Sequence, residues 1–183
     1  SEVIPNPTIE AVGHGVTAYL MARPQVVVAY GGGSVIDTAK AMHKAALDVA
    51  DYAWSADGSR LLIFTNTRKV WRDNTRGDYW VLTVASGKLQ KIGAGAPEAS
   101  LMFAKFSPDA TRVGYVRGND LYVESLADGK VTALTTDGSE TTINGTSDWV
   151  YEEELGVRDA FRWSPDGRRI AYWQFDSAGV GLF

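Results

Sequence analysis

The sequence contains no cysteine and only two histidines among its 183 residues. Without cysteine there is no disulfide scaffold, no thiol nucleophile and no metal site with thiolate ligands. The two histidines, His14 and His43, both lie in the first 50 residues and are far apart in sequence. Isolated histidines are more typical of surface or packing positions than of metal ligands, so we expect no metal site.

Long apolar runs and an excess of basic charge are also missing. The longest apolar run, residues 26–30, is far shorter than the roughly 18–20 residues of a membrane-spanning helix. Eighteen Lys and Arg stand against 22 Asp and Glu, a net charge of -4, so no basic stripe exists to neutralise phosphates. Residues 1–7 lack the basic and apolar pattern of a signal peptide. We therefore expect a soluble globular chain with neither nucleic acid nor membrane as a partner.

The chain divides into two unlike pieces. All six tryptophans follow residue 50, whereas both histidines precede it, which places a boundary near residues 47–51. Before the boundary, a β-branched run at 25–30, a glycine turn and good helix formers at 34–47 predict a short α/β segment. After it, short apolar stretches alternate with turn residues. We predict two parts, residues 1–47 and residues 48–183.

A turn signal repeats three times in the second part. The strings are WSADG at 54–58, FSPDA at 106–110 and WSPDG at 163–167, and their aspartates are 52 and 57 residues apart. A β-rich stretch follows each turn. Periods near 50 residues with about four strands each are typical of propeller blades. The predicted fold is mainly β: a partial β-propeller of about three four-stranded antiparallel blades, preceded by the α/β segment. An ordinary antiparallel sandwich is the alternative.

Three stretches then carry a family resemblance: VWR at 70–72, NGTSDWVYEEEL at 144–155 and residues 161–175. With them, residues of about 50–180 resemble the propeller domain of bacterial dipeptidyl peptidase IV, a serine peptidase of the prolyl oligopeptidase type. The resemblance implies that this part selects peptides with a free N-terminus. It also implies an exported, periplasmic location in bacteria.

The resemblance assigns three substrate-binding residues. Glu153 and Glu154 would hold the peptide ammonium, a compact cation with three donors that two adjacent carboxylates satisfy. Arg72 would reach a backbone carbonyl of the substrate, and its guanidinium could also hold the carboxylate pair in place. Without the resemblance, the acidic run is more typical of a solvated face, and the alternative for Arg72 is a surface salt bridge.

The residues needed for peptide cleavage are missing from this chain. A serine peptidase needs a nucleophile, a base and an orienting acid, but no histidine follows His43. No Gly-x-Ser-x-Gly elbow occurs, since residues 32–36 (GGSVI) lack the closing glycine. We expect the chain alone to bind peptides without hydrolysing them.

Residues 1–47 carry a second resemblance, through PNPT at 5–8 and GGGSVIDTAK at 31–40. They resemble the cofactor-binding segment of iron-containing alcohol dehydrogenases. In that family the glycine turn holds the cofactor pyrophosphate, which implies contacts from Gly32, Gly33 and Ser34. The alternative is a tight turn that needs glycine. The rest of the cofactor site and the metal domain are missing, so we expect no bound cofactor and no redox activity.

The two resemblances share neither fold nor chemistry, which indicates a join between unrelated pieces. An engineered chimera, a gene fusion and an assembly error all fit the residues equally. Two alternative functions therefore remain beside peptide recognition: a nucleotide-binding fragment of an iron-containing alcohol dehydrogenase, and a chimera without activity of its own. The peptidase-like part is expected to be truncated at both ends. About three blades cannot close a propeller, so we also expect self-association through open blade edges.

Overall fold

The structure is a computed structural model and describes residues 49–180. The chain divides into two units between Ala50 and Asp51, and the second unit contains nearly all of the architecture below. The predictions made for residues 1–47, including the cofactor contacts Gly32, Gly33 and Ser34, lie outside the described residues.

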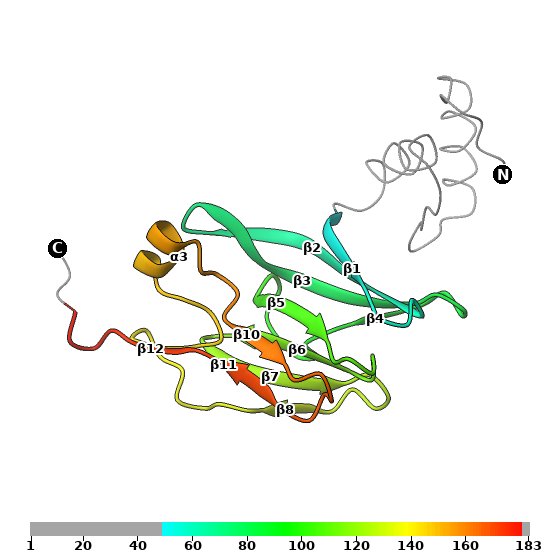
Figure 1. Ribbon diagram of the computed structural model, residues 1–183. Coiled ribbons are helices and arrows are strands. Elements are labelled where there is room, and N and C mark those ends of the chain that lie inside the picture. The colour runs from blue at the N-terminus through cyan, green and yellow to red at the C-terminus, as the bar shows by residue number, and fades with distance from the viewer. Residues whose placement is uncertain (1–48, 181–183) are drawn as a thin grey trace, which may run out of the picture. The chain divides into compact units, whose positions relative to one another are not determined.

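The first blade is a run of four strands that neighbour one another in chain order. The strands are β1 (Val49–Trp54), β2 (Arg60–Val70), β3 (Asp73–Thr83) and β4 (Lys88–Lys91). β3 pairs antiparallel with both β2 and β4. The hairpin of β2 and β3 is much longer than β4, so its far end extends beyond the rest of the blade (Figure 1).

The second blade repeats the same antiparallel arrangement. Its strands are β5 (Leu101–Phe106), β6 (Arg112–Arg117), β7 (Asp120–Ser125) and β8 (Val131–Ala133). A short antiparallel pairing joins the two blades, with Arg76 opposite Met102 and Gly77 opposite Leu101. The eight strands therefore form one sheet.

Two smaller pairs and one helix complete the described residues. β10 (Phe161–Trp163) and β11 (Ile170–Tyr172) form the hairpin that begins a third blade. β9 (Thr142–Asn144) pairs with β12 (Gln174–Asp176), and helix α3 (Trp149–Leu155) lies between β9 and β10 in sequence. The prediction of a mainly β, partial propeller is confirmed, with two complete blades and the first hairpin of a third in the described part.

The three repeated turns have the same hydrogen bonds, which explains the repeat. In each, a serine hydroxyl donates to the aspartate two residues later at 2.5–2.6 Å, and accepts from the backbone N–H of the arginine five residues later at 2.9–3.0 Å. The residues are Ser55, Asp57 and Arg60; Ser107, Asp109 and Arg112; and Ser164, Asp166 and Arg169. Each turn joins the first strand of its blade to the second.

The main apolar core lies between the first two blades. It contains Leu62, Val81, Leu101 and Val113 among its buried side chains. A smaller cluster of Val116, Leu121 and Phe161 joins the second blade to β10.

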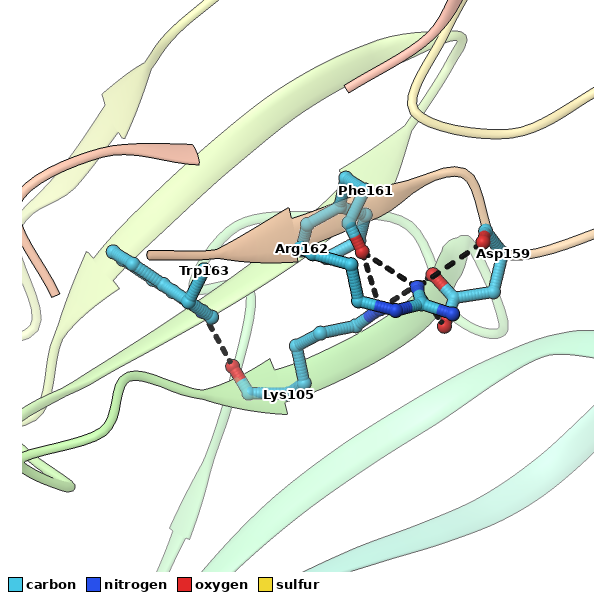
Figure 2. A network of polar contacts seen from close by, with 5 residues as sticks. All are labelled: Lys105, Asp159, Phe161, Arg162 and Trp163. Atoms are coloured by element: carbon cyan, nitrogen blue, oxygen red, sulfur yellow. Dashed lines mark hydrogen bonds and ion pairs between the residues drawn. The ribbon is translucent and has the colours of Figure 1, made fainter. Parts of the chain in front are cut away.

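Polar contacts around Lys105 connect the second blade to the third (Figure 2). The Lys105 Nζ atom forms an ion pair with Asp159, donates to the Phe161 carbonyl at 3.0 Å and lies 3.9 Å from the centroid of the Phe161 ring. The Trp163 Nε1 atom donates to the Lys105 carbonyl at 3.4 Å. Burial lowers the pKa of Lys105, because desolvation disfavours its charged form.

Candidate functional site

Helix α3 carries the acidic string, and local residues determine where it begins and ends. The N-cap Asp148 accepts through its side chain from the backbone N–H of Tyr151 at 2.9 Å. The C-terminal Gly156 is left-handed, with φ of 65°, a conformation that glycine adopts without steric cost. The sequence pattern did not predict this helix, although both capping residues are typical of helix ends. Among residues 49–180, no helix is long and apolar enough to cross a membrane.

The long β2–β3 hairpin brings a second segment to α3 (Figure 1). Val70 pairs with Asp73, so Trp71 and Arg72 form a two-residue loop at the far end of the hairpin. Trp71 has a φ of 50°, which is uncommon for a bulky residue. Such backbone conformations are concentrated at functional sites, where surrounding contacts maintain them.

Arg72 and Glu153 form an ion pair between this loop and α3. The Arg72 Nε atom lies 2.8 Å from the Glu153 Oε2 atom. The two side chains differ in exposure: that of Arg72 is 76% exposed and that of Glu153 only 8%. The other carboxylate oxygen of Glu153, Oε1, is buried and has no hydrogen-bond partner in the structure. A buried acceptor without a partner is costly, so a donor that reached this oxygen would offset that cost.

Glu154 follows directly on α3 and is exposed. Within residues 49–180 its carboxylate has no ion-pair partner, and Arg72 contacts Glu153 rather than both acids. The structure therefore brings together Arg72 and Glu153, and places Glu154 beside them through the helix. Two carboxylates and one guanidinium leave one net negative charge, which suits a single monovalent cation.

A second set of ion pairs joins the same two segments, and the sequence analysis missed it. The Nε atom of Arg158 lies 3.2 Å from the Oε1 atom of Glu152, whose side chain is only 4% exposed. Its Nη2 atom also forms an ion pair with Asp73, the neighbour of Arg72 in the hairpin. Asp73 and Arg158 are far apart in sequence, so no local pattern would have found this pairing.

Aromatic side chains pack together beside α3. Tyr151 of α3 packs against Phe175 of β12 with ring centroids 4.6 Å apart, and Trp173 meets the same ring at 6.0 Å. Trp149 and Trp71 are each about half exposed. The contact between Tyr151 and Phe175 packs α3 against β12.

A cavity in the described part of the chain lies away from α3. A cavity of about 270 Å³ lies between β1, β2 and β5, where its lining includes Tyr52, Phe64, Tyr79 and Lys105 but no residue of α3. No group of three or more acidic or histidine side chains in the described part of the chain is arranged to hold a metal ion.

A family model for the N-terminal region of dipeptidyl peptidase IV matches residues 55–183. The chain belongs to this family. The match covers every strand from β2 onward and includes Arg72 and the whole of α3.

Relatives and a solved structure agree with this assignment. A probable dipeptidyl-aminopeptidase B of Aspergillus clavatus is 34% identical over 83% of this chain and 17% of its own length. A probable dipeptidyl peptidase 4 of Trichophyton verrucosum is 37% identical over 73% of this chain and 17% of its own length. The crystal structure of Porphyromonas gingivalis dipeptidyl peptidase 4 matches with a TM-score of 0.68 and 29% identity, over 73% of this chain and 19% of that one. The chain thus spans less than a fifth of these proteins.

A second family model, for iron-containing alcohol dehydrogenase, matches residues 1–72. It overlaps the first match at residues 55–72, which comprise the first repeated turn, the whole of β2 and the hairpin loop. Both resemblances read from the sequence are therefore confirmed.

Proposed function

We propose that the second unit of this chain recognises the free N-terminus of a peptide, as the substrate-selecting part of a dipeptidyl-peptidase-IV-like serine peptidase. Glu153 and Glu154 bind the ammonium group, and Arg72 orients Glu153 and donates to a carbonyl of the peptide. The observation that carries this proposal is the buried Glu153 Oε1 atom, which has no partner while Oε2 is held by Arg72.

Charge and chemistry both support an ammonium ligand. Its three N–H donors form charge-assisted hydrogen bonds with carboxylate oxygens, which are stronger than bonds between neutral groups. One ammonium also balances the single negative charge that remains after Arg72 has neutralised one acid. The 76% exposure of the Arg72 side chain leaves its remaining N–H groups free for a substrate carbonyl.

The test compares a free dipeptide with its N-acetylated form by isothermal titration calorimetry. We expect the free form to bind at least about tenfold more tightly, because acetylation removes the cation. Glu153→Gln and Glu154→Gln should each reduce this preference, whereas Glu140→Gln, an exposed acid outside the site, should not. Equal binding of free and acetylated peptides by the unmodified protein would overturn the proposal.

We also propose that this chain binds without cleaving. A catalytic triad needs a base, and no histidine follows His43 in the sequence. Release of a chromogenic leaving group from a dipeptide substrate should therefore stay at the rate seen without protein. Turnover that copurifies with the chain and is lost in Ser34→Ala would contradict this.

The match of residues 1–72 to iron-containing alcohol dehydrogenase favours a second candidate function, binding of a dinucleotide. In this alternative, Gly32, Gly33 and Ser34 contact its pyrophosphate. Saturable quenching of tryptophan fluorescence by a dinucleotide, absent in a Gly33→Val variant, would support it. Unchanged fluorescence together with no heat of binding would exclude it.

A further inference from the structure

Two ion-pair bridges join α3 to the loop of the β2–β3 hairpin. In the first, Arg72 of the loop contacts Glu153 of the helix. In the second, Arg158 contacts both Glu152 of the helix and Asp73, the first residue of β3 after the loop. The bridges use neighbouring residues on each side, 72 and 73 at the end of the hairpin and 152 and 153 on the helix. The position of one bridge therefore constrains the other.

The backbone around Arg158 is itself held in place. Just before it, the Val157 N–H donates to the Tyr151 carbonyl at 3.1 Å, and the Val157 carbonyl accepts from the Ser147 hydroxyl. Just after it, the Ala160 N–H donates to the Gly145 carbonyl at 3.0 Å. Because these bonds attach the segment to α3 and to the residues just before it, the Arg158 side chain extends from an ordered base toward the hairpin.

Arg158 differs from Arg72 in what it can offer a ligand. Its guanidinium already contacts two carboxylates, one of them on the buried Glu152 side chain. Arg72 is largely exposed and has a single carboxylate partner. A forked guanidinium that joins two carboxylates fixes their separation, which a lysine ammonium on a flexible stem does not do.

We propose that Arg158 is a positioning residue for the ammonium site, and that it acts through Glu152 and Asp73 to hold Arg72 and Glu153 at contact distance. This inference rests on the proposed function and adds a residue that does not touch the ligand. Loss of the second bridge lets the hairpin loop move away from α3, so that Glu153 Oε2 loses Arg72 and the acids lose their arrangement.

A direct electrostatic role and a positioning role predict opposite changes in ammonium affinity when Arg158 is removed. Arg158 carries a positive charge near a site for a cation, so on Coulomb grounds its removal should tighten ammonium binding. A positioning role predicts that Arg158→Ala weakens the binding of a free dipeptide, by about tenfold. Arg158→Lys keeps the charge but not the fork: electrostatics alone predicts unchanged affinity, and positioning predicts a loss.

The experiment measures calorimetric affinity for the free and the acetylated dipeptide in the full chain. We compare the unmodified protein with Arg158→Ala, Arg158→Lys and the matched control Arg162→Ala. Arg162 is an exposed arginine of the neighbouring strand whose carboxylate partner is Asp159, not a residue of α3 or the loop. Circular dichroism and a thermal melt establish that each variant is folded at the temperature used. If Arg158→Ala is not folded, the same affinities are compared in Arg158→Lys and Asp73→Asn, where positioning again predicts weaker binding of the free dipeptide.

A double-mutant cycle distinguishes positioning from a general loss of stability. In a Glu153→Gln background, Arg158→Ala should have no further effect on the preference for free over acetylated peptide. The reason is that the Glu153 carboxylate, which Arg158 helps to position, is already removed. Tighter or unchanged binding by folded Arg158→Ala would overturn the inference, as would an additive cycle. Failure of the proposed function is seen separately, as a lack of preference in the unmodified protein.

Discussion

The Arg112 side chain of the second blade donates through Nη2 to the Gly167 carbonyl in the turn of the third, at 2.7 Å. Arg60 of the first blade donates in the same way to the Ala110 carbonyl in the turn of the second. Each arginine is the fifth residue after a turn serine, and each acceptor is the third residue after the next one. The repeated turn therefore also joins successive blades.

Arg112→Ala should destabilise the second unit, because it removes a charge-assisted hydrogen bond between blades. We expect the free energy of unfolding to fall by about 1.5–3 kcal/mol, and Arg60→Ala to act similarly. Arg169 occupies the equivalent position in the third blade but is exposed, and its side chain has no partner among residues 49–180. Arg169→Ala is thus the matched control, with an expected change within about 0.5 kcal/mol. Urea unfolding followed by tryptophan fluorescence measures all three; equal losses would contradict this role.

The turn aspartates should make stability depend on pH. Hydrogen bonds from Ser55 and Ser107 lower the pKa of Asp57 and Asp109 from 3.8 to about 2. A folded-state pKa below the unfolded one stabilises the folded protein above about pH 4, and this contribution is lost as pH falls toward 2.

Unfolding in urea at several pH values between 5 and 2 tests this dependence. Asp57→Asn and Asp109→Asn should each flatten the decline in unfolding free energy below pH 4. Glu98→Gln provides the control, because Glu98 is exposed and its side chain accepts no hydrogen bond in the described residues. A decline equally steep in all variants would show that other groups cause it.

Gly77→Ala should strain the β2–β3 hairpin at the residue that also pairs with the second blade. A Cβ atom at this position would lie 2.4 Å from the Phe64 ring and 2.6 Å from the Thr65 carbonyl oxygen. Overpacking of this kind typically costs about 1–3 kcal/mol. Gly179→Ala, where a Cβ atom meets open space, is the control. Differential scanning calorimetry should show a lower melting temperature for Gly77→Ala alone.

Arg72→Lys should weaken peptide binding without unfolding the protein. Lysine keeps the charge but has no Nε donor in the position from which Arg72 contacts Glu153, so both the acid and the substrate carbonyl lose directed hydrogen bonds. We expect about a tenfold loss of affinity for a free dipeptide and a melting temperature within about 2 °C of the parent. Calorimetric titration and a thermal melt measure the two effects, and unchanged affinity would argue against a directional role for Arg72.

The sequence by itself determined the repeated turns and the strands after them. The serine, the aspartate and the arginine N–H of each turn lie within six residues, and their hydrogen bonds form locally. Because each turn is a short contiguous string, the interval between blades could be recognised from the sequence. Helix α3 was not predicted because it is only seven residues long. So short a segment has too few apolar positions for a helical period to be recognised.

Only the tertiary structure decided which charges meet. The acidic string and the Val-Trp-Arg stretch were visible in sequence, and the resemblance assigned them a common site. The contacts of Arg72 with Glu153, and of Arg158 with Asp73, join residues about 80 positions apart. Such pairs form because a long hairpin extends beyond its blade to reach a capped helix, and because packing holds both segments in place. Side-chain charge alone does not select among the many possible partners, so their choice depends on the folded chain.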